Sequence, residues 1–348
     1  MMDFAGCGAL NLDIIYELQS SDFSNVLGFD LQPGHEVVLP RERLAGTLER
    51  LSEHGRMIAR SGGGSAANTM CILAAMGRTT MFFGVAGAEK AGEEVIASMR
   101  GVDTSLVQRL NENQVCIVLL SRKSRDRGLC VFSASQSLFE VPETWMKALP
   151  HVRCLHLSSF SNPRQLRLQE ELAGHLEAHQ LLSLDPGEIY SALGRERLTG
   201  LLKRTNILFI TEHEVELLTG MAVYDGAKCL LSMLCSHRPE FKLFEQTAGA
   251  IVVVKQGKKG AAAFGCDGLI LQMNACEVKE VVDTTGAGDA FNAGFLSAMF
   301  AGEGLEVCIK EGHRMAALSI SDFGRNWLNV LVASDGFFQH LKGIGLPV

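Results

Sequence analysis

The sequence predicts an α/β protein of three-layer α/β/α type, in which a mainly parallel central sheet lies between helices. From about residue 150 onward, short apolar runs alternate with longer segments of helical spacing. The composition, with 47% hydrophobic and 20% charged residues, is that of a globular protein. A chain of 348 residues can bury a large core, so we expect a single domain over residues 1–348 with a small β-sheet attached.

The first third of the chain predicts strands outside that alternation. Residues 5–9 form an expected first core strand, and residues 12–17 and 35–39 are further expected strands that do not follow the later alternation. A further pair, 114–120 and 128–133, is separated by charged residues and predicts a hairpin. This hairpin could build the small attached sheet, or it could supply edge strands of the core sheet.

The later part of the chain predicts the main sheet. Four apolar runs predict buried strands: residues 152–157, 181–184, 207–210 and 251–254. The segments 164–179 and 214–218 between them carry helical spacing. Strands that alternate with helices favour a parallel sheet covered on both faces.

Charge and cysteine content exclude several classes of protein. A formal net charge of −7 disfavours nucleic acid as a partner, because such binding needs a basic face. No apolar run approaches the roughly 20 residues of a membrane span, and the N-terminus lacks the basic start of a secretory signal. The ten cysteines form no CxxC pair, which predicts reduced core thiols and a cytoplasmic location.

The strongest chemical motif is Asp-Thr-Thr-Gly-Ala-Gly-Asp-Ala-Phe at residues 283–291, followed by a predicted helix. Gly286, Ala287 and Gly288 are small enough for backbone amides to approach an anion, and a helix start adds positive potential. A carboxylate at Asp289 could accept the proton of an attacking hydroxyl. The alternative is an ordinary glycine-rich turn in which Asp289 caps the helix.

Two further motifs place polar groups beside glycines. Residues 61–68 read Ser-Gly-Gly-Gly-Ser-Ala-Ala-Asn and open a predicted helix that ends at Gly77, with Asn68 in its first turn. Near the N-terminus, Asn11 and Asp13 alternate with leucines and therefore share one face of a strand. They could bind vicinal hydroxyls. The alternatives are a capped helix start and a polar strand edge.

Together these motifs resemble the ribokinase (PfkB) family of carbohydrate and nucleoside kinases. Residues 63–68 look like its N-terminal signature and residues 283–291 like its C-terminal signature. Residues 184–187 and 253–260 resemble two further family segments, so the likeness spans essentially the whole chain. The long stretch 23–60 is more similar to the adenosine-kinase-like branch than to compact ribokinases.

The resemblance implies an ATP-dependent phosphotransferase with a ribokinase-like fold. Asp289 would be the catalytic base that deprotonates a hydroxymethyl group, and Gly286, Ala287 and Gly288 would form the anion hole with the Asp289 amide. The substrate hydroxyls would be held by the remaining matched residues: Asp13, Asn11, Gly63, Gly64 and Asn68.

The resemblance also implies ATP and Mg²⁺ as cofactors. Gly257, Gly260 and His313 would line the nucleotide site, and Glu214 would order Mg²⁺ through water. The family usually shows Asn-Glu-x-Glu where this chain has Thr-Glu-His-Glu at residues 211–214, so Thr211 cannot reproduce the amide donor. A monovalent cation (K⁺) would be held in part by two residues of the C-terminal motif, Asp283 and Thr285, which could equally be a capped strand end.

A lid over the acceptor would come from about residues 12–45 and 111–135, and lid strands that pair between subunits would make a homodimer.

The acceptor is a small-molecule sugar or nucleoside; a nucleoside needs an apolar slot, for which Phe132, Phe139 and Phe160 are candidates. An adenosine or nucleoside kinase specifically, or a non-catalytic sugar or nucleotide sensor on the same fold, are the alternatives. A nicotinamide-dependent dehydrogenase is disfavoured, because Asn11 occupies the third glycine position of GxGxxG.

Overall fold

Nine strands form the large sheet in the described part of the chain, which comprises residues 1–123, 127–134, 137–234, 243–245, 247 and 249–328 of a computed structural model. Their order is β16-β15-β14-β13-β12-β11-β1-β5-β7. The strands from β14 to β7 are parallel, and β15 and β16 are antiparallel additions at one edge. In sheet order the bounds are Gly268–Met273, Ala261–Gly265, Ile251–Lys255, Ile207–Thr211, Leu181–Asp185, Val152–Ser158, Met2–Cys7, Thr80–Phe83 and Val102–Asp103.

Helices cover both faces of this sheet, because its central strands are apolar on both sides. In β13, Ile207 and Phe209 pack into one core cluster, whereas Leu208 and Ile210 pack into another. The first cluster includes residues of α3 (Ser65–Ala75), α11 (Ala287–Phe300) and α12 (Leu305–Ser319). The second includes α5 (Glu143–Ala148), α6 (Leu166–Gly174), α8 (Arg195–Leu202), α9 (Glu212–Thr219) and α10 (Val223–Leu234). The three-layer α/β/α architecture is thereby confirmed.

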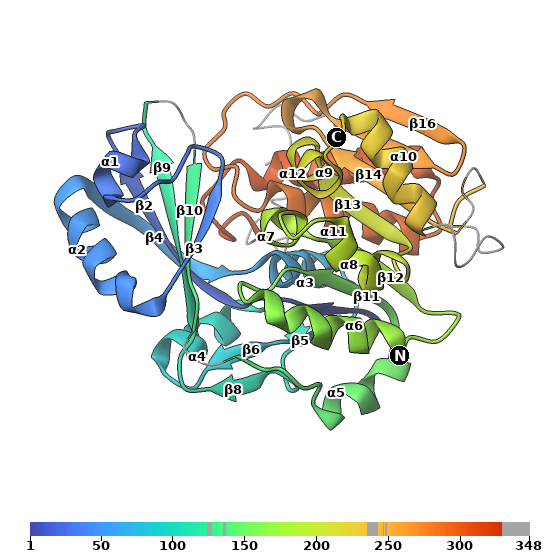
Figure 1. Cartoon of the computed structure of the whole chain (residues 1–348), viewed down its shortest axis with the longest axis horizontal. Helices are drawn as coiled ribbons and strands as arrows, with labels where there is room; N and C mark the ends of the chain where they lie inside the picture. The colour runs from blue at the N-terminus through green and yellow to red at the C-terminus, as the bar shows by residue number, and fades with distance from the viewer. Residues whose placement is uncertain (124–126, 135–136, 235–242, 246, 248, 329–348) are drawn as a thin grey trace.

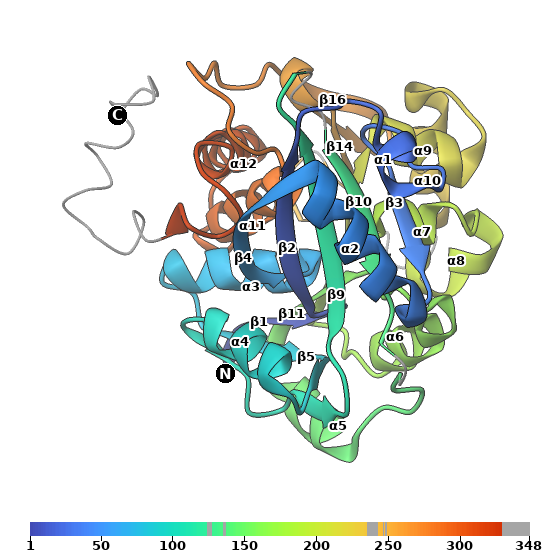
Figure 2. The ribbon, with the colours of Figure 1, turned by 90° about the vertical axis from the view of Figure 1, so that its left-hand side faces the viewer.

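A separate five-stranded sheet lies beside the large one, on the left of Figure 1 and facing the viewer in Figure 2. Its order is β3-β10-β9-β2-β4. The bounds in that order are Glu36–Leu39, Arg127–Phe132, Gln114–Ser121, Asn11–Leu18 and Gly55–Gly63. On its outer side lie α1 (Phe23–Leu27) and α2 (Leu44–His54), whose apolar residues pack with those of β2. The predicted hairpin therefore belongs to a small sheet and not to the edge of the core sheet.

Short elements complete the described chain. A two-stranded parallel sheet pairs β6 (Val85–Gly87) with β8 (Gln108–Leu110), and α4 (Lys90–Ser98) lies between them in sequence. The helix α7 (Gly187–Ser191) follows β12 directly. Four 3₁₀ turns occupy Arg41–Arg43, Leu149–His151, Pro163–Gln165 and Gly257–Lys259.

Some predicted boundaries differ from the observed ones for local reasons. The first strand spans Met2–Cys7 and not residues 5–9, because the chain leaves the sheet at Gly8, where a side chain would collide with Ser158. The helix expected over residues 164–179 ends at Gly174, and a turn closed by the Gln180 amide on the Glu177 carbonyl follows. The strand Gly55–Gly63 was not expected at all.

The expectation that the cysteines are reduced core thiols is wrong for Cys266. This residue is disulfide-bonded and exposed, because it lies in the tight turn between β15 and β16 and not in a core strand. Eight other cysteines in the described residues are free, and six of them are buried. Over the same residues, no single helix has the length and apolarity needed to cross a membrane, although the bent pair α9 and α10 meets the criterion jointly.

The contact between α11 and α12 depends on glycines. A Cβ atom at Gly294 would collide with the backbone carbonyl of Glu311 on α12. We therefore expect Gly294→Ala to lower the free energy of unfolding by about 1–3 kcal/mol through overpacking. Chemical denaturation at constant pH measures this change.

Gly46 in α2 is the matched control, because a Cβ there meets no atom within 4 Å. Gly46→Ala should raise the free energy of unfolding by about 0.5–1 kcal/mol, as in an open helix position. A Gly294→Ala protein as stable as the wild type would contradict the close packing of the two helices.

Candidate active site

The start of α11 is built by the Thr-Gly-Ala-Gly-Asp segment. Gly286 is the N-cap residue, with a left-handed φ of 79° that favours glycine. The first helical hydrogen bond runs from the Ala290 amide to the Gly286 carbonyl over 2.9 Å. The amides of Gly288 and Asp289 belong to the first turn and have no backbone acceptor among the described residues, which leaves them for an anion.

Asp289 is buried in that first turn, with 7% of its surface exposed. Its Oδ2 accepts a hydrogen bond of 2.7 Å from Nδ2 of Asn68, which α3 places beside it. Burial, and then repulsion from the Asp185 carboxylate, raise the pKa of Asp289 to about 7, against the opposing effects of Asn68 and Lys255. A carboxyl of this pKa suits proton transfer near neutral pH.

Asp13 reaches the same pocket from β2 of the small sheet. Gly63 lies opposite Asn11 on the neighbouring strand β4, and a Cβ atom at Gly63 would collide with the Asp13 carboxylate. Burial first, and then the nearby carboxylates, raise the pKa of Asp13 to about 7 against the attraction of Arg325. Its Oδ1 is buried and accepts no hydrogen bond from the described residues, as expected for a group that awaits a hydroxyl donor.

Arg325 contacts Asn68 in the same pocket. Its Nε donates to Oδ1 of Asn68 over 2.8 Å, and its Nη1 donates to Oγ of Ser98 over 3.1 Å. Asn68 is therefore fixed at both ends of its amide, with Asp289 on one side and Arg325 on the other. Asp13, Asn68, Gly286 and Arg325 line one pocket, together with Trp327.

A buried ion pair lies beneath the start of α11. Nζ of Lys255, at the end of β14, donates to Oδ2 of Asp185, at the end of β12, over 2.5 Å. Nδ2 of Asn292 donates to the same oxygen over 2.6 Å. Burial opposes ionisation of Asp185, but the Lys255 ammonium prevails and lowers the pKa of this carboxyl. Gly288 leaves room for the lysine, because a Cβ there would lie 3.1 Å from Nζ.

Thr211 and Glu214 form a capping box at the start of α9. Oγ1 of Thr211 accepts from the Glu214 amide over 3.2 Å, and Oε2 of Glu214 accepts from the Thr211 amide over 2.8 Å. Burial and the Asp185 carboxylate raise the pKa of Glu214. Thr211 thus serves the helix start, and one carboxylate oxygen of Glu214 stays available for a ligand.

The expected nucleotide residues lie in two places. Gly257 begins the 3₁₀ turn after β14 with φ 56°, and a Cβ there would meet no atom within 4 Å, so its surroundings are open. Gly260 ends that turn with φ 104°, and a Cβ there would collide with the Met273 carbonyl. His313 is instead buried between helices, with its ring 5.4 Å from that of Phe291, and burial lowers its pKa.

The structure thus brings together Asp13, Gly63, Asn68, Gly286 and Asp289. Gly64 begins the turn into α3, and Asn11 accepts a hydrogen bond of 2.5 Å from Nε2 of Gln114, away from the Asn68–Asp289 contact. The aromatic candidates Phe132 and Phe160 are buried in the two core clusters, and Phe139 is exposed.

Sequence reasoning missed Lys255, Asn292 and Arg325 as site residues. A lysine that directly ends an apolar strand run was a usable signal for Lys255, and the i, i+3 spacing from Asp289 was one for Asn292. No pattern in the sequence indicates Arg325, because it reaches Asn68 only through the fold.

Comparison with known proteins was consistent with this geometry. Residues 37–327 match the pfkB family carbohydrate kinase. An uncharacterized sugar kinase of Archaeoglobus fulgidus is 26% identical over 254 residues, which cover 72% of this chain and 95% of that protein. A nucleoside kinase of Methanothermobacter thermautotrophicus is 24% identical over 266 residues, 75% of this chain and 79% of that one. The crystal structure of adenosine kinase from Sinorhizobium meliloti shares the fold with a TM-score of 0.79 at 20% identity, over 96% of this chain and 98% of that one.

Because the pKa of Asp289 is raised in the folded protein, we expect the stability of the fold to depend on pH. Its pKa of about 7 in the folded protein exceeds the ordinary value of 3.8, so the folded state binds the proton more tightly and loses stability as pH rises from about 4 to 7. Asp289→Asn should therefore melt about 2 °C or more above the wild type at pH 8, with a difference that shrinks towards pH 4. Calorimetric melting temperatures across this range measure the effect.

The control is Asp225→Asn, which makes the same change in the first turn of α10 at an exposed position. Its melting temperature should follow that of the wild type at every pH. A difference for Asp289→Asn that is independent of pH would contradict the raised pKa.

Proposed function

Because the chain belongs to the pfkB family of carbohydrate kinases, we propose that it transfers the γ-phosphoryl group of ATP to a hydroxymethyl group of a sugar or nucleoside, with Asp289 as the catalytic base. The observation that carries the proposal is the position of a carboxyl with a pKa of about 7 in the same helical turn as amides without a backbone acceptor. A base and an anion site therefore lie next to each other.

Asp289 acts on the acceptor. Its ionised carboxylate takes the proton of the hydroxymethyl group while the hydroxyl oxygen attacks the γ-phosphorus, and the bond to the leaving ADP oxygen breaks. Asn68 holds Oδ2 in place, so the other oxygen is left for the substrate. Burial raises the pKa of Asp289 to about 7, so its carboxylate accepts a proton at neutral pH more readily than an ordinary aspartate does.

The start of α11 and Lys255 act on the phosphoryl group. The amides of Gly288 and Asp289 and the helix dipole stabilise the negative charge that develops on the transferred group, whereas the Ala287 amide already donates to the Thr284 carbonyl. Lys255 lies beside Gly288, so its ammonium adds positive charge at the same place. Because it is already paired with Asp185, it is held there without the loss of side-chain freedom on binding.

The donor set fits ATP and Mg²⁺. Mg²⁺ prefers oxygen ligands, and the Glu214 carboxylate retains one oxygen outside the capping box, beside Asp185. When bound, the metal neutralises phosphate charge. The open surroundings of Gly257 support a place for the nucleotide there. His313 is packed against Phe291, so a contact with adenine would have to be made from that buried position.

Asp13 and Asn68 hold the acceptor hydroxyls in this proposal. The unpartnered Oδ1 of Asp13 is an acceptor for a hydroxyl proton. The same face of β2 carries Ile15, and the neighbouring strand β9 adds Cys116 and Val118, so a buried apolar face adjoins this carboxylate. That face favours a nucleoside, whose base needs an apolar wall, over a free sugar.

The small sheet would act as the lid. Its predicted ranges, residues 12–45 and 111–135, include β2, β3, β9 and β10, and the sheet also contains β4, which lies outside them. Its edges are β3 and β4, and an edge strand can pair with a second copy. A homodimer through this sheet would appear in sedimentation equilibrium as twice the chain mass; a single-chain mass at all concentrations would exclude it.

A K⁺ site at Asp283 and Thr285 is a further part of the proposal. Oδ1 of Asp283 accepts from the Thr285 amide over 2.8 Å, and Oδ2 accepts from the Gly324 amide over 3.3 Å, as in a capped turn. Only the buried Thr285 Oγ1, which has no hydrogen-bond partner among the described residues, favours an ion. Equal turnover in sodium and potassium buffers would remove K⁺ from the scheme.

We also propose that the protein is located in the cytoplasm, where Mg-ATP is available.

Removal of the base should abolish turnover without loss of the fold. Asp289→Asn keeps the shape and the Asn68 contact region but cannot accept a proton, so kcat should fall by about 10²–10⁴-fold. A coupled assay of ADP release in the presence of the acceptor measures kcat. The Asp225→Asn protein is again the control and should turn over at the wild-type rate.

Full phosphotransfer by Asp289→Asn would overturn the assignment of the base. ATP binding without turnover of any acceptor by the wild type would instead favour the sensor alternative, although the kinase names of the relatives give it no support.

The acceptor class is tested by a screen of nucleosides and free sugars with Mg-ATP. We expect nucleosides to give the higher kcat/KM, because the apolar face beside Asp13 contacts the base. The variant Val118→Asn places a polar group on that face and should lower kcat/KM for nucleosides more than for free sugars. Equal losses for both classes would show that this face does not contact the acceptor.

A further inference from the structure

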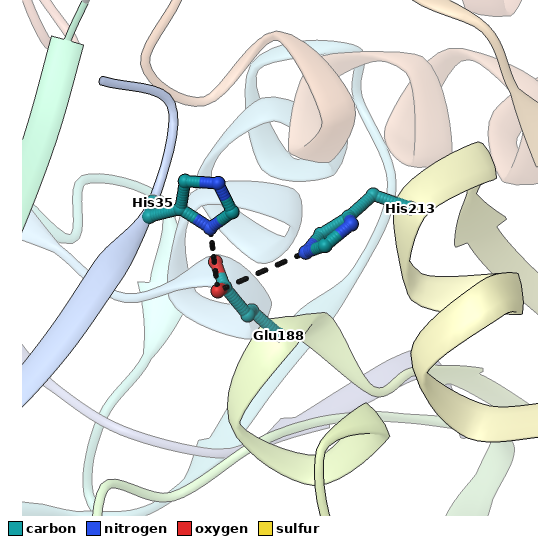
Figure 3. A group of neighbouring side chains, drawn as sticks. All are labelled: His35, Glu188 and His213. Carbon is teal, nitrogen blue, oxygen red and sulfur yellow. Dashed lines mark hydrogen bonds and ion pairs between the residues drawn. The ribbon is translucent and has the colours of Figure 1, made fainter. Parts of the chain in front are cut away.

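Three potential metal ligands meet where the small sheet approaches the large body. His35 directly precedes β3 of the small sheet, Glu188 lies in α7, and His213 lies in the first turn of α9. Figure 3 shows both imidazole rings directed at the carboxylate of Glu188. The three side chains therefore converge from segments that are far apart in sequence.

The distances suit a small metal ion. Oε1 of Glu188 lies 3.0 Å from Nδ1 of His35 and 3.9 Å from Nε2 of His213, and all three ligand atoms lie within 4.8 Å of one another. Neighbouring ligand atoms of a tetrahedral zinc ion are about 3.4 Å apart, given bonds of about 2.0–2.2 Å. A bound ion would thus require changes of at most about 1.4 Å in these separations.

Hydrogen bonds orient the cluster from both sides. The second carboxylate oxygen of Glu188 accepts from the Glu36 amide over 3.2 Å, which turns Oε1 towards the rings. The His35 carbonyl accepts from the Leu129 amide over 3.1 Å, which ties the residue to β10. Support of a ligand by a second hydrogen bond is a regular feature of metal sites in proteins.

We propose that His35, Glu188 and His213 form a zinc-type transition-metal site, which tethers β3 of the small sheet to α7 and α9. Two imidazoles and one carboxylate select Zn²⁺ and related ions, whereas Mg²⁺ and Ca²⁺ prefer oxygen ligands alone. The side chain of His213 is 48% exposed, so water reaches the fourth position. The three ligands do not include Glu214, the residue proposed for Mg²⁺, and the site does not depend on the proposed reaction.

The competing explanation is a plain ion pair between Glu188 and a protonated histidine, which needs no metal. The two explanations differ in what the protein binds. A metal site takes up one equivalent of ion and requires both histidines, whereas an ion pair takes up none.

Cobalt titration of the chelator-treated full chain, without ATP, distinguishes the two. Four-coordinate Co²⁺ absorbs strongly in the visible range and the hydrated ion only weakly, so the spectrum reports the site directly. We expect one Co²⁺ per chain, displaced by Zn²⁺ and not by millimolar Mg²⁺. His213→Ala and Glu188→Gln should each weaken Co²⁺ binding by more than about 100-fold, beyond the loss seen on removal of supporting groups.

The matched control is His179→Ala. His179 also lies beside a glutamate, 3.5 Å from Glu177, but outside the described cluster, and should leave Co²⁺ binding unchanged. Hydrogen exchange supplies a second measurement: Zn²⁺ should slow exchange of residues 35–39 in the wild type and not in His213→Ala. Weak binding by the wild type, or equal binding by His213→Ala, would overturn the site. Because neither readout involves turnover, this outcome would leave the proposed kinase activity standing.

Discussion

The ammonium group of Lys255 is the charge around which the active site is organised. It lies at the carboxyl edge of β14, pairs with Asp185 at the same edge of β12, and fits beneath Gly288 of α11. Removal of one partner from a buried pair typically costs about 3–5 kcal/mol, because the other charge stays buried alone. The pair thus links two strand ends and a helix start, and fixes the first turn of α11, which carries Asp289, against the sheet.

Burial raises the pKa values of the carboxyl groups in this region, and the Lys255 charge opposes that effect for Asp185 and Asp289. Asp185 is paired with Lys255, so its pKa is lowered and it stays ionised. At Asp289, burial and the repulsion from Asp185 outweigh the attraction of Lys255, and the pKa is raised to about 7. Asp13 reaches a similar pKa from the other sheet. Because ionisation of these two buried carboxyl groups is unfavourable, they lower the free energy of unfolding near neutral pH. Such destabilising, pKa-shifted groups are common at functional sites.

Strand and helix patterns predicted most of the fold, because both faces of the large sheet are buried and its strands are apolar throughout. The 283–291 and 61–68 motifs assigned Asp289 and Asn68 to one candidate site, and the hydrogen bond between the two side chains is a finding of the structure. The strand Gly55–Gly63 was not predicted, because it is an edge strand with mixed polar residues, paired only with β2. No local sequence pattern predicts the role of Arg325 either, because its contact with Asn68 spans 257 positions along the chain.

The passage from β4 into α3 has a mechanical consequence. Only Gly64 separates the last residue of the small sheet's edge strand from the helix that carries Asn68, and its φ of 104° brings it against the carbonyl of Ala9. Ala9 itself belongs to the short link between β1 and β2, so two of the connections between the sheets touch at one point. This contact joins the two connections close to Asn68, whose amide donates to Asp289. The attachment of the small sheet and the start of α3 are thereby fixed to each other by backbone alone.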